Sequence, residues 1–191
     1  MIDRAQLAWF PQSTPTTCGP ACVVMALRHF GVEPAADAAT ERAIDDHCAT
    51  ASAGQPPPPE VSHISHPELA RYWLGRGLRA RQYRAGVSSD IAANPKFARY
   101  FAVEREAIAS GLELITTEPE PDRLAADLSE GWIAIVRVLL HGRGHHQLVY
   151  GATADSFAVA CPSEGLLTVS AAALAESMTT KTGRSALLLR P

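Results

Sequence analysis

The sequence predicts an α+β domain whose first half is rich in helices and whose second half is rich in strands. Two patterns carry this prediction. The mostly apolar run 18–30 has the length of a helix rather than of a strand. Residues 145–151 and 156–161 are apolar stretches joined by the short polar segment 152–155, a pattern typical of a β-hairpin. The chain is long enough to bury a sizeable core, and we expect one domain over residues 1–191.

Each helix of the first half is marked by the residues at its ends. The helix over 18–30 is followed directly by a glycine, which favours a helix C-terminus. Residues 34–50 are rich in alanine and acidic residues and predict a second helix. A third, over 67–76, has proline in its first turn and glycine after its end. The stretch 51–60 contains four consecutive prolines and predicts a surface loop with polyproline character.

The second half begins with residues 78–84, which alternate as a strand with arginines at 79, 81 and 84. We interpret these arginines as a solvated strand face, with a carboxylate or phosphate site as the alternative. Residues 95–110 predict a helix within the longer segment 88–118. Downstream, we expect a helix over 121–130, a strand over 132–140, a glycine-rich loop over 141–144, the hairpin, a short helix over 170–178 and a last strand over 185–189.

Composition narrows the classes of partner. A net charge of -3 and a pI near 6.1 provide no basic field for nucleic acid or for an anionic membrane surface. The chain begins without the apolar core of a signal peptide, and no stretch approaches the ~18 apolar residues of a membrane helix. We therefore expect a cytoplasmic protein with reduced thiols that binds neither nucleic acid nor membranes. The oligomeric state stays open.

The four cysteines are too few for a disulfide scaffold of this size. Cys18 and Cys22 lie one helical turn apart on one face, which is not the spacing of a zinc knuckle. A zinc site formed by Cys18, Cys161 and histidines of the segment 141–146 is an alternative, and so is a regulatory disulfide between Cys18 and Cys161. Our prediction is that the protein uses no metal and no cofactor.

Cys18 is the candidate nucleophile because it opens an apolar helix in the sequence Cys-Gly-Pro-Ala-Cys. The N–H groups and the dipole of a helix N-terminus stabilise a thiolate. Hydrolysis of an amide also needs a proton carrier and a donor for the oxyanion. His145 and His146 lead into an expected strand and provide the proton carrier. Gln12 is an amide donor on an upstream segment that two prolines keep out of a helix.

These residues resemble the papain-like cysteine peptidases, and most closely the bacteriocin-processing branch that cuts after double-glycine leaders. In that family a glutamine precedes the nucleophile by six residues, as Gln12 precedes Cys18, and Cys-Gly-Pro-Ala opens the helix. The family's catalytic histidine precedes an orienting Asp or Asn by sixteen residues. Sixteen residues after His145 is Cys161, where this branch usually reads Asp before a proline. The one departure falls on the third member of the triad.

The resemblance covers residues 9–31 and 121–191 well and makes 88–118 look like an insertion. It implies a papain-like α+β fold in which a helical half carrying Cys18 packs on a mostly antiparallel sheet carrying His145 and Cys161. The expected site lies in the groove between the two halves.

The resemblance also implies a mechanism. Cys18 attacks the carbonyl of a peptide, or of a small amide or thioester, and its N–H and Gln12 hold the oxyanion while His145 carries the proton. The resulting acyl-enzyme makes the protein a hydrolase if water resolves it and an acyltransferase if an amine does. The sequence leaves both open, together with a non-catalytic descendant that binds peptides in the old cleft.

The choice of histidine stays open as well. Family spacing selects His145, and His146 is the alternative base. Strand alternation places His145 on one face with Gln147 and Val149, and His146 on the other with Leu148 and Tyr150.

Cys161 decides how well the site works. In a simple hairpin, positions 145 and 161 face each other. A neutral thiol accepts hydrogen bonds weakly. We expect either a working site in which another group helps to hold His145, or a site that has been weakened or repurposed.

Overall fold

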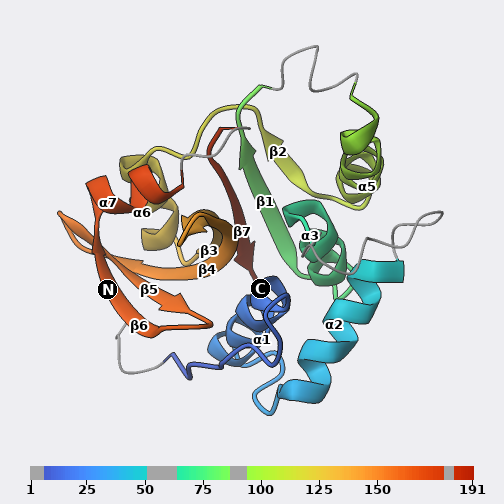
Figure 1. Cartoon of the computed structure of the whole chain (residues 1–191), viewed down its shortest axis with the longest axis horizontal. Coiled ribbons are helices and arrows are strands. Elements are labelled where there is room, and N and C mark those ends of the chain that lie inside the picture. The colour runs from blue at the N-terminus through green and yellow to red at the C-terminus, as the bar shows by residue number, and fades with distance from the viewer. Residues whose placement is uncertain (1–6, 51–63, 87–93, 179–182) are drawn as a thin grey trace.

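A seven-stranded sheet forms the centre of the protein (Figure 1). The structure is a computed structural model that describes residues 7–50, 64–86, 94–178 and 183–191. The strands are β1 (Arg79–Arg84), β2 (Glu113–Ile115), β3 (Ile133–Leu140), β4 (Arg143–Ala152), β5 (Ser156–Cys161), β6 (Gly165–Ser170) and β7 (Ser185–Arg190). Their order is β2-β1-β7-β3-β4-β5-β6, and all neighbours are antiparallel except the parallel pair β1 and β2.

Helices cover both faces of this sheet. They are α1 (Cys18–His29), α2 (Ala38–Thr50), α3 (His66–Leu74), the short 3-10 helix η2 (Pro95–Phe97), α5 (Ala98–Ala109), α6 (Pro121–Ser129) and α7 (Ala171–Ser177). Figure 1 shows α6 and α7 at the upper left of the sheet and α1, α2 and α3 at the lower right. The α+β fold and the mostly antiparallel sheet predicted from the sequence are confirmed.

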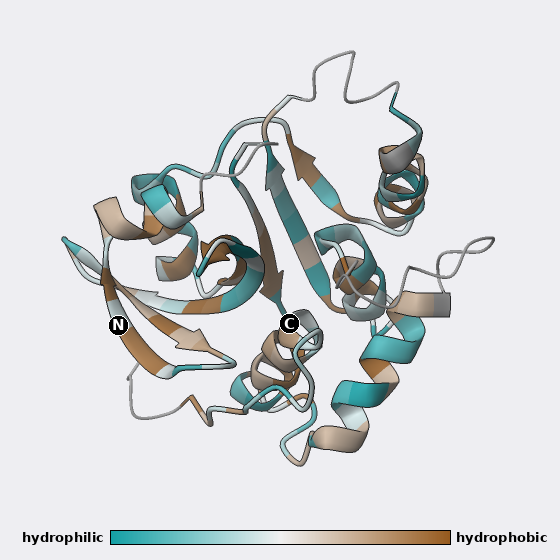
Figure 2. Cartoon of the chain, in the orientation of Figure 1, coloured by the Kyte–Doolittle hydropathy of each residue, from teal (hydrophilic) through white to brown (hydrophobic). Residues whose placement is uncertain are grey.

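Side chains that alternate along β3 build two cores. Ile133 and Ile135 pack with α1, α2 and α3, whereas Ala134 and Val136 pack with α6 and α7. Helix α1 lies inside the first core, and its residues from Cys18 to Leu27 are all buried. Figure 2 shows this helix largely in brown, in contrast to the mostly teal α2. Helix α1 is therefore held by apolar packing along its length.

Several expected boundaries need correction. The second helix begins at Ala38 rather than at residue 34, because the Asp37 carboxylate accepts hydrogen bonds from the N–H groups of Ala39 and Thr40 and caps the helix there. Strands β2 and β6 were not predicted. Strand β6 alternates between partly buried and exposed residues, and its sequence, Gly-Leu-Leu-Thr-Val-Ser, contains three apolar side chains. The predicted loop 51–60 and residues 88–93 of the predicted insertion lie outside the described residues.

Two local features of β4 set the position of the site. A two-residue turn with positive φ at His141 and Gly142 joins β3 to β4, so β4 begins at Arg143 within the expected loop. Further along, the pairing of β4 with β5 shifts at Tyr150, between Val149 and Gly151.

This bulge changes the hairpin register by one residue. Leu148 pairs with Ala160, and the same register continued places Cys161 next to Gln147. Positions 145 and 161 meet as expected, but diagonally: Cys161 lies opposite Gln147, and its Sγ is 3.4 Å from His145 Nε2 on the same face. Within the described residues, no helix has the length and apolar character needed to cross a membrane.

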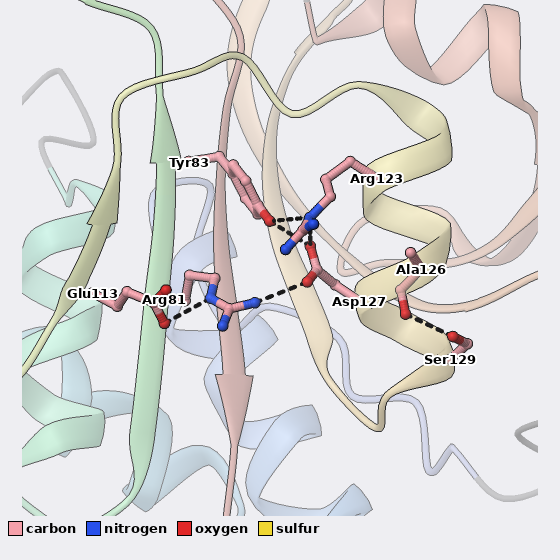
Figure 3. A network of polar contacts seen from close by, with 7 residues as sticks. All are labelled: Arg81, Tyr83, Glu113, Arg123, Ala126, Asp127 and Ser129. Carbon is pink, nitrogen blue, oxygen red and sulfur yellow. Dashed lines mark hydrogen bonds and ion pairs between the residues drawn. The ribbon is translucent and has the colours of Figure 1, made fainter.

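A buried carboxylate joins β1 to α6 (Figure 3). Asp127 is fully buried and accepts hydrogen bonds from Arg81 Nη1 at 2.9 Å and from the Tyr83 hydroxyl at 2.7 Å, while Arg123 Nε lies 3.5 Å away. Arg81 also pairs with the exposed Glu113. The arginines of β1 are therefore only partly the solvated strand face that we expected, because Arg81 forms ion pairs with both Asp127 and Glu113.

Replacing Asp127 by alanine should destabilise the fold by about 3 kcal/mol, because it leaves Arg81 and the Tyr83 hydroxyl without their buried partner. Urea denaturation measures this loss. The matched control is Glu113→Ala, which removes the other carboxylate on the same Arg81 but from an exposed position, and should cost less than about 1 kcal/mol. Equal losses in the two variants would show that burial does not set the strength of this network.

Candidate active site

Cys18 is the first residue of α1 and is buried, with 3% of its surface exposed. Thr17 precedes it but makes no side-chain cap, and its hydroxyl instead accepts a hydrogen bond from the N–H of Thr14. The N–H groups of the first turn have no partner within the helix and are not taken by this side chain. The helix therefore begins with a thiol beside the backbone N–H groups of Cys18 and Gly19, since Pro20 has none.

Gly19 explains how other elements come close to this thiol. A Cβ atom at this position would lie 3.2 Å from Leu69 Cδ1 and 3.5 Å from His146 Nδ1. The absence of a side chain lets α3 and β4 approach the start of α1.

The structure brings both histidines of β4 to the cysteines. Cys18 Sγ lies 3.5 Å from His146 Nδ1, across 128 positions of sequence. Cys161 Sγ lies 3.4 Å from His145 Nε2. Cys18 also favours the protonated form of the His145 ring, so this ring interacts with both thiols. Cys18, His145, His146 and Cys161 thus form one buried cluster.

The two histidines differ in charge. Burial disfavours the His145 imidazolium, but hydrogen bonds with Cys161 and Cys18, together with attraction to both, outweigh it and raise its pKa to about 9. Burial lowers the pKa of His146 well below its ordinary value, and His66, Arg137 and His145 lower it further. At neutral pH, His145 is therefore the charged imidazole and His146 the neutral one.

His66 of α3 extends this cluster. Its ring lies 5.3 Å from that of His146, and burial followed by the charge of Arg137 lowers its pKa to about 3. His66 is 4% exposed, and its Nε2 has no hydrogen-bond partner among the residues that the structure describes. The side of His146 away from His145 is thus lined by a second neutral imidazole.

The second nitrogen of His145 faces sulfur and a hydroxyl rather than a carboxylate. Ser163 Oγ lies 3.3 Å from Cys161 Sγ and 3.5 Å from His145 Nε2. The Gln147 side chain also hydrogen-bonds with Cys161. Ser163 lies in the turn after β5, and Gln147 shares the strand face of His145. The position of the expected acid is therefore occupied by a group of three side chains.

Gln12 lies on an extended segment before α1 that hydrogen bonds hold at residues 9, 12 and 13. Its N–H donates to the Pro162 carbonyl at 3.2 Å, Trp9 Nε1 donates to the Cys161 carbonyl at 2.9 Å, and the buried Glu41 accepts from the N–H of Ser13. The Gln12 side chain does not bond the thiol, because its Nε2 donates to the Thr14 carbonyl at 2.7 Å. Gln12 is thus held beside the Cys161 turn, with its amide directed along its own loop.

The other cysteines are not equivalent to Cys18. Burial, with Cys18 and Cys161 nearby, raises the pKa of Cys22, and burial also raises that of Cys48. All four cysteines belong to the described residues, and none forms a disulfide. In the same part of the chain, no three His, Cys, Asp or Glu side chains are arranged to hold a metal ion.

Two solved structures with a similar fold are a protease and a peptidase domain of transporters. A double-glycine motif protease from an AMS/PCAT transporter, in complex with the leader peptide, superposes with a TM-score of 0.55 at 13% identity and covers 100% of this chain and 96% of its own. The peptidase domain of Streptococcus ComA, a bifunctional ABC transporter involved in a quorum sensing pathway, gives 0.58 at 14% and covers 97% and 98%. No protein-family model and no curated protein matches the chain. At these identities the likeness establishes the fold, which is papain-like.

Sequence reasoning missed three residues of the site. Ser163 and Gln147 follow closely on Cys161 and His145, but only the bulged register brings them together. His66 lies at the start of α3, where the capping box of Ser65 and Glu68 marked a helix and gave no sign of a site.

Proposed function

We propose that this protein is a cysteine hydrolase that cleaves a peptide or amide bond through an acyl-enzyme on Cys18. One observation carries the proposal: the thiol at the start of α1 shares a buried cluster with His145, the charged histidine, whose Nε2 lies 3.4 Å from a third group, the Cys161 sulfur. A nucleophile whose base is oriented by a third group is the arrangement that covalent catalysis requires. The papain-like fold supports the same assignment.

In this mechanism the His145 imidazolium stabilises Cys18 as a thiolate. The sulfur attacks the carbonyl carbon, and the Cys18 N–H holds the oxyanion, with the Gln12 amide turning from Thr14 as the second donor. The C–N bond breaks as His145 gives its proton to the leaving amine, which leaves a thioester. Neutral His145 then takes a proton from water, and the hydroxide releases the acid and regenerates Cys18.

The substrate that we propose is a peptide, because the structural neighbour described above holds a leader peptide. Apolar side chains stand exposed beside the cluster. Trp9 contacts the Cys161 carbonyl, and Leu166 pairs with Ala160, one residue before Cys161. These surfaces favour apolar residues in the peptide. Reduced thiols fit a cytoplasmic location.

An acyltransferase is the second candidate, and His146 favours it. Its neutral Nδ1 lies 3.5 Å from Cys18 Sγ, so an unprotonated imidazole adjoins the sulfur that would carry the acyl group. Such a base can accept the proton of an incoming amine.

Peptides that end in Gly-Gly joined to a fluorescent amine test both candidates. We expect release of the amine, and a thioester on Cys18 that can be trapped by acid quenching and located by mass spectrometry. Addition of glycinamide separates the two functions, because a hydrolase yields mainly the free acid and an acyltransferase yields the new amide. If a varied set of such peptides gives no thioester and no release, but still binds, the protein is a non-catalytic descendant.

A further inference from the structure

Cys161 occupies an unusual place for a thiol. It is fully buried, its Sγ lies 3.4 Å from His145 Nε2, and Ser163 Oγ lies 3.3 Å from the same sulfur. A buried neutral thiol would accept only weak hydrogen bonds here. The groups around it are instead those that would stabilise a negative charge.

Titratable and charged groups approach this sulfur and His145 from several elements. Cys18 and Cys22 on α1 act on His145 and Cys161, and His146 adjoins His145 on β4. His66 on α3 and Arg137 on β3 act on His146 instead. Glu164 is the acid next to Ser163 in sequence, but its carboxylate lies 3.5 Å from His141 Nε2. Arg137 adds positive charge on the His146 side.

The balance favours the thiolate. Burial opposes it, but hydrogen bonds with His145, Ser163 and Gln147 outweigh burial and lower the pKa of Cys161 to about 7. The pKa of His145 is raised to about 9. Between these two values, Cys161 is negative and His145 is positive, which is the charge pattern of an Asp–His pair.

We infer that Cys161 acts as a thiolate positioning residue, which gives His145 the negative partner that a carboxylate gives elsewhere, with Ser163 and Gln147 as its hydrogen-bond donors. This inference rests on the proposed function of Cys18 and His145. The proton of Cys161 Sγ moves to His145 Nε2, so a thiol and an imidazole become a thiolate and an imidazolium with no change in net charge. The imidazolium keeps its other N–H for Cys18 and for the leaving amine.

A thiolate partner makes catalysis depend on pH in a way that a carboxylate does not. As pH falls through about 7, Cys161 gains a proton and His145 loses its negative partner. An aspartate at this position would stay ionised down to a pH of about 4. Cys161→Asp should therefore keep activity at mildly acidic pH where the parent protein loses it.

A thiolate titration tests the inference without any substrate. Ultraviolet absorbance counts thiolates as pH rises, and Cys18→Ala removes the nucleophile from the count. We expect Cys18→Ala to show one thiolate appearing near pH 7, and the double variant with Cys161→Ser to lack it. Cys48→Ser in the same background is the matched control and should leave the signal unchanged. No thiolate below the ordinary range near pH 8.5 would overturn the inference.

Activity supplies the second test, with the Gly-Gly substrates described above. Cys161→Asp should move the acidic limb of the kcat/KM profile down by about one pH unit or more. Cys161→Ser cannot ionise and should lose about tenfold or more at neutral pH. Ser163→Ala should move the acidic limb to higher pH, because Cys161 loses a hydrogen-bond donor.

Identical profiles for the parent and Cys161→Asp would contradict the inference. A thiolate near pH 7 in a protein without peptidase activity would instead count against the proposed function.

Discussion

Replacing Cys18 by alanine is expected to abolish cleavage, with a loss of about a thousandfold or more in kcat. In the proposed mechanism the acyl-enzyme forms on this sulfur, and Cys22 on the same helix cannot replace it because it faces a buried core and burial raises its pKa. Cleavage of the Gly-Gly fluorescent amide measures the rate, and intact mass spectrometry measures the trapped thioester. The fold should survive, since alanine fits a helix start that apolar packing holds along its length.

Cys48→Ala is the matched control for this change. Cys48 is also a fully buried helical cysteine, but it lies in α2, away from the cluster. We expect the control to lose some stability, as a large-to-small core change does, while its kcat stays near that of the parent. If Cys18→Ala keeps its activity while Cys48→Ala loses it, the nucleophile has been assigned wrongly.

Replacing His145 by alanine is expected to lower kcat by a factor of about 10²–10⁴, the usual contribution of a positioned acid and base. His145 is the charged histidine, and it interacts with both Cys18 and Cys161. Its loss removes the positive partner of the Cys18 thiolate and the acid that protonates the leaving amine. The rate at which iodoacetamide alkylates Cys18 should fall as well, which reports on the thiolate independently of any substrate.

His146→Ala provides the comparison, since His146 is the next residue and is equally buried. Burial and neighbouring charges keep it neutral, so it cannot serve as the counter-ion of a thiolate. We expect a smaller loss, about tenfold, and little change in the pH profile of alkylation. A greater loss in His146→Ala than in His145→Ala would identify His146 as the base, in keeping with its 3.5 Å distance to Cys18 Sγ.

The local patterns of the chain were enough to predict most of the fold. The apolar run after Cys18 and the paired apolar stretches before and after residues 152–155 appear as α1 and the β4–β5 hairpin. These elements are encoded locally, because helical length and strand alternation depend on residues close in sequence. Strand β6 was missed although Leu166, Leu167 and Val169 are apolar residues common in strands; it lies at the edge of the sheet and pairs with β5.

The sequence alone could not predict which side chains surround Cys161, the residue at the third position of the triad. The bulge at Tyr150 shifts the register by one, and Ser163 and Gln147 thereby reach Cys161 while it still contacts His145. A bulge depends on how the hairpin packs between α1 on one side and α6 and α7 on the other. Spacing in the chain identified Cys161 as the residue that replaces the usual acid of the family, but it did not predict which side chains contact its sulfur.

The sequence by itself determined which residues could react: a cysteine opening an apolar helix, a histidine pair on a strand and a cysteine where an acid was expected. Only the tertiary structure decided their charges. His145 and His146 are neighbours of the same type, yet contact with two thiols raises the pKa of one while burial beside His66 and Arg137 lowers that of the other. The physical reason is that a pKa depends on desolvation and on charges and donors from distant segments, which meet only after folding.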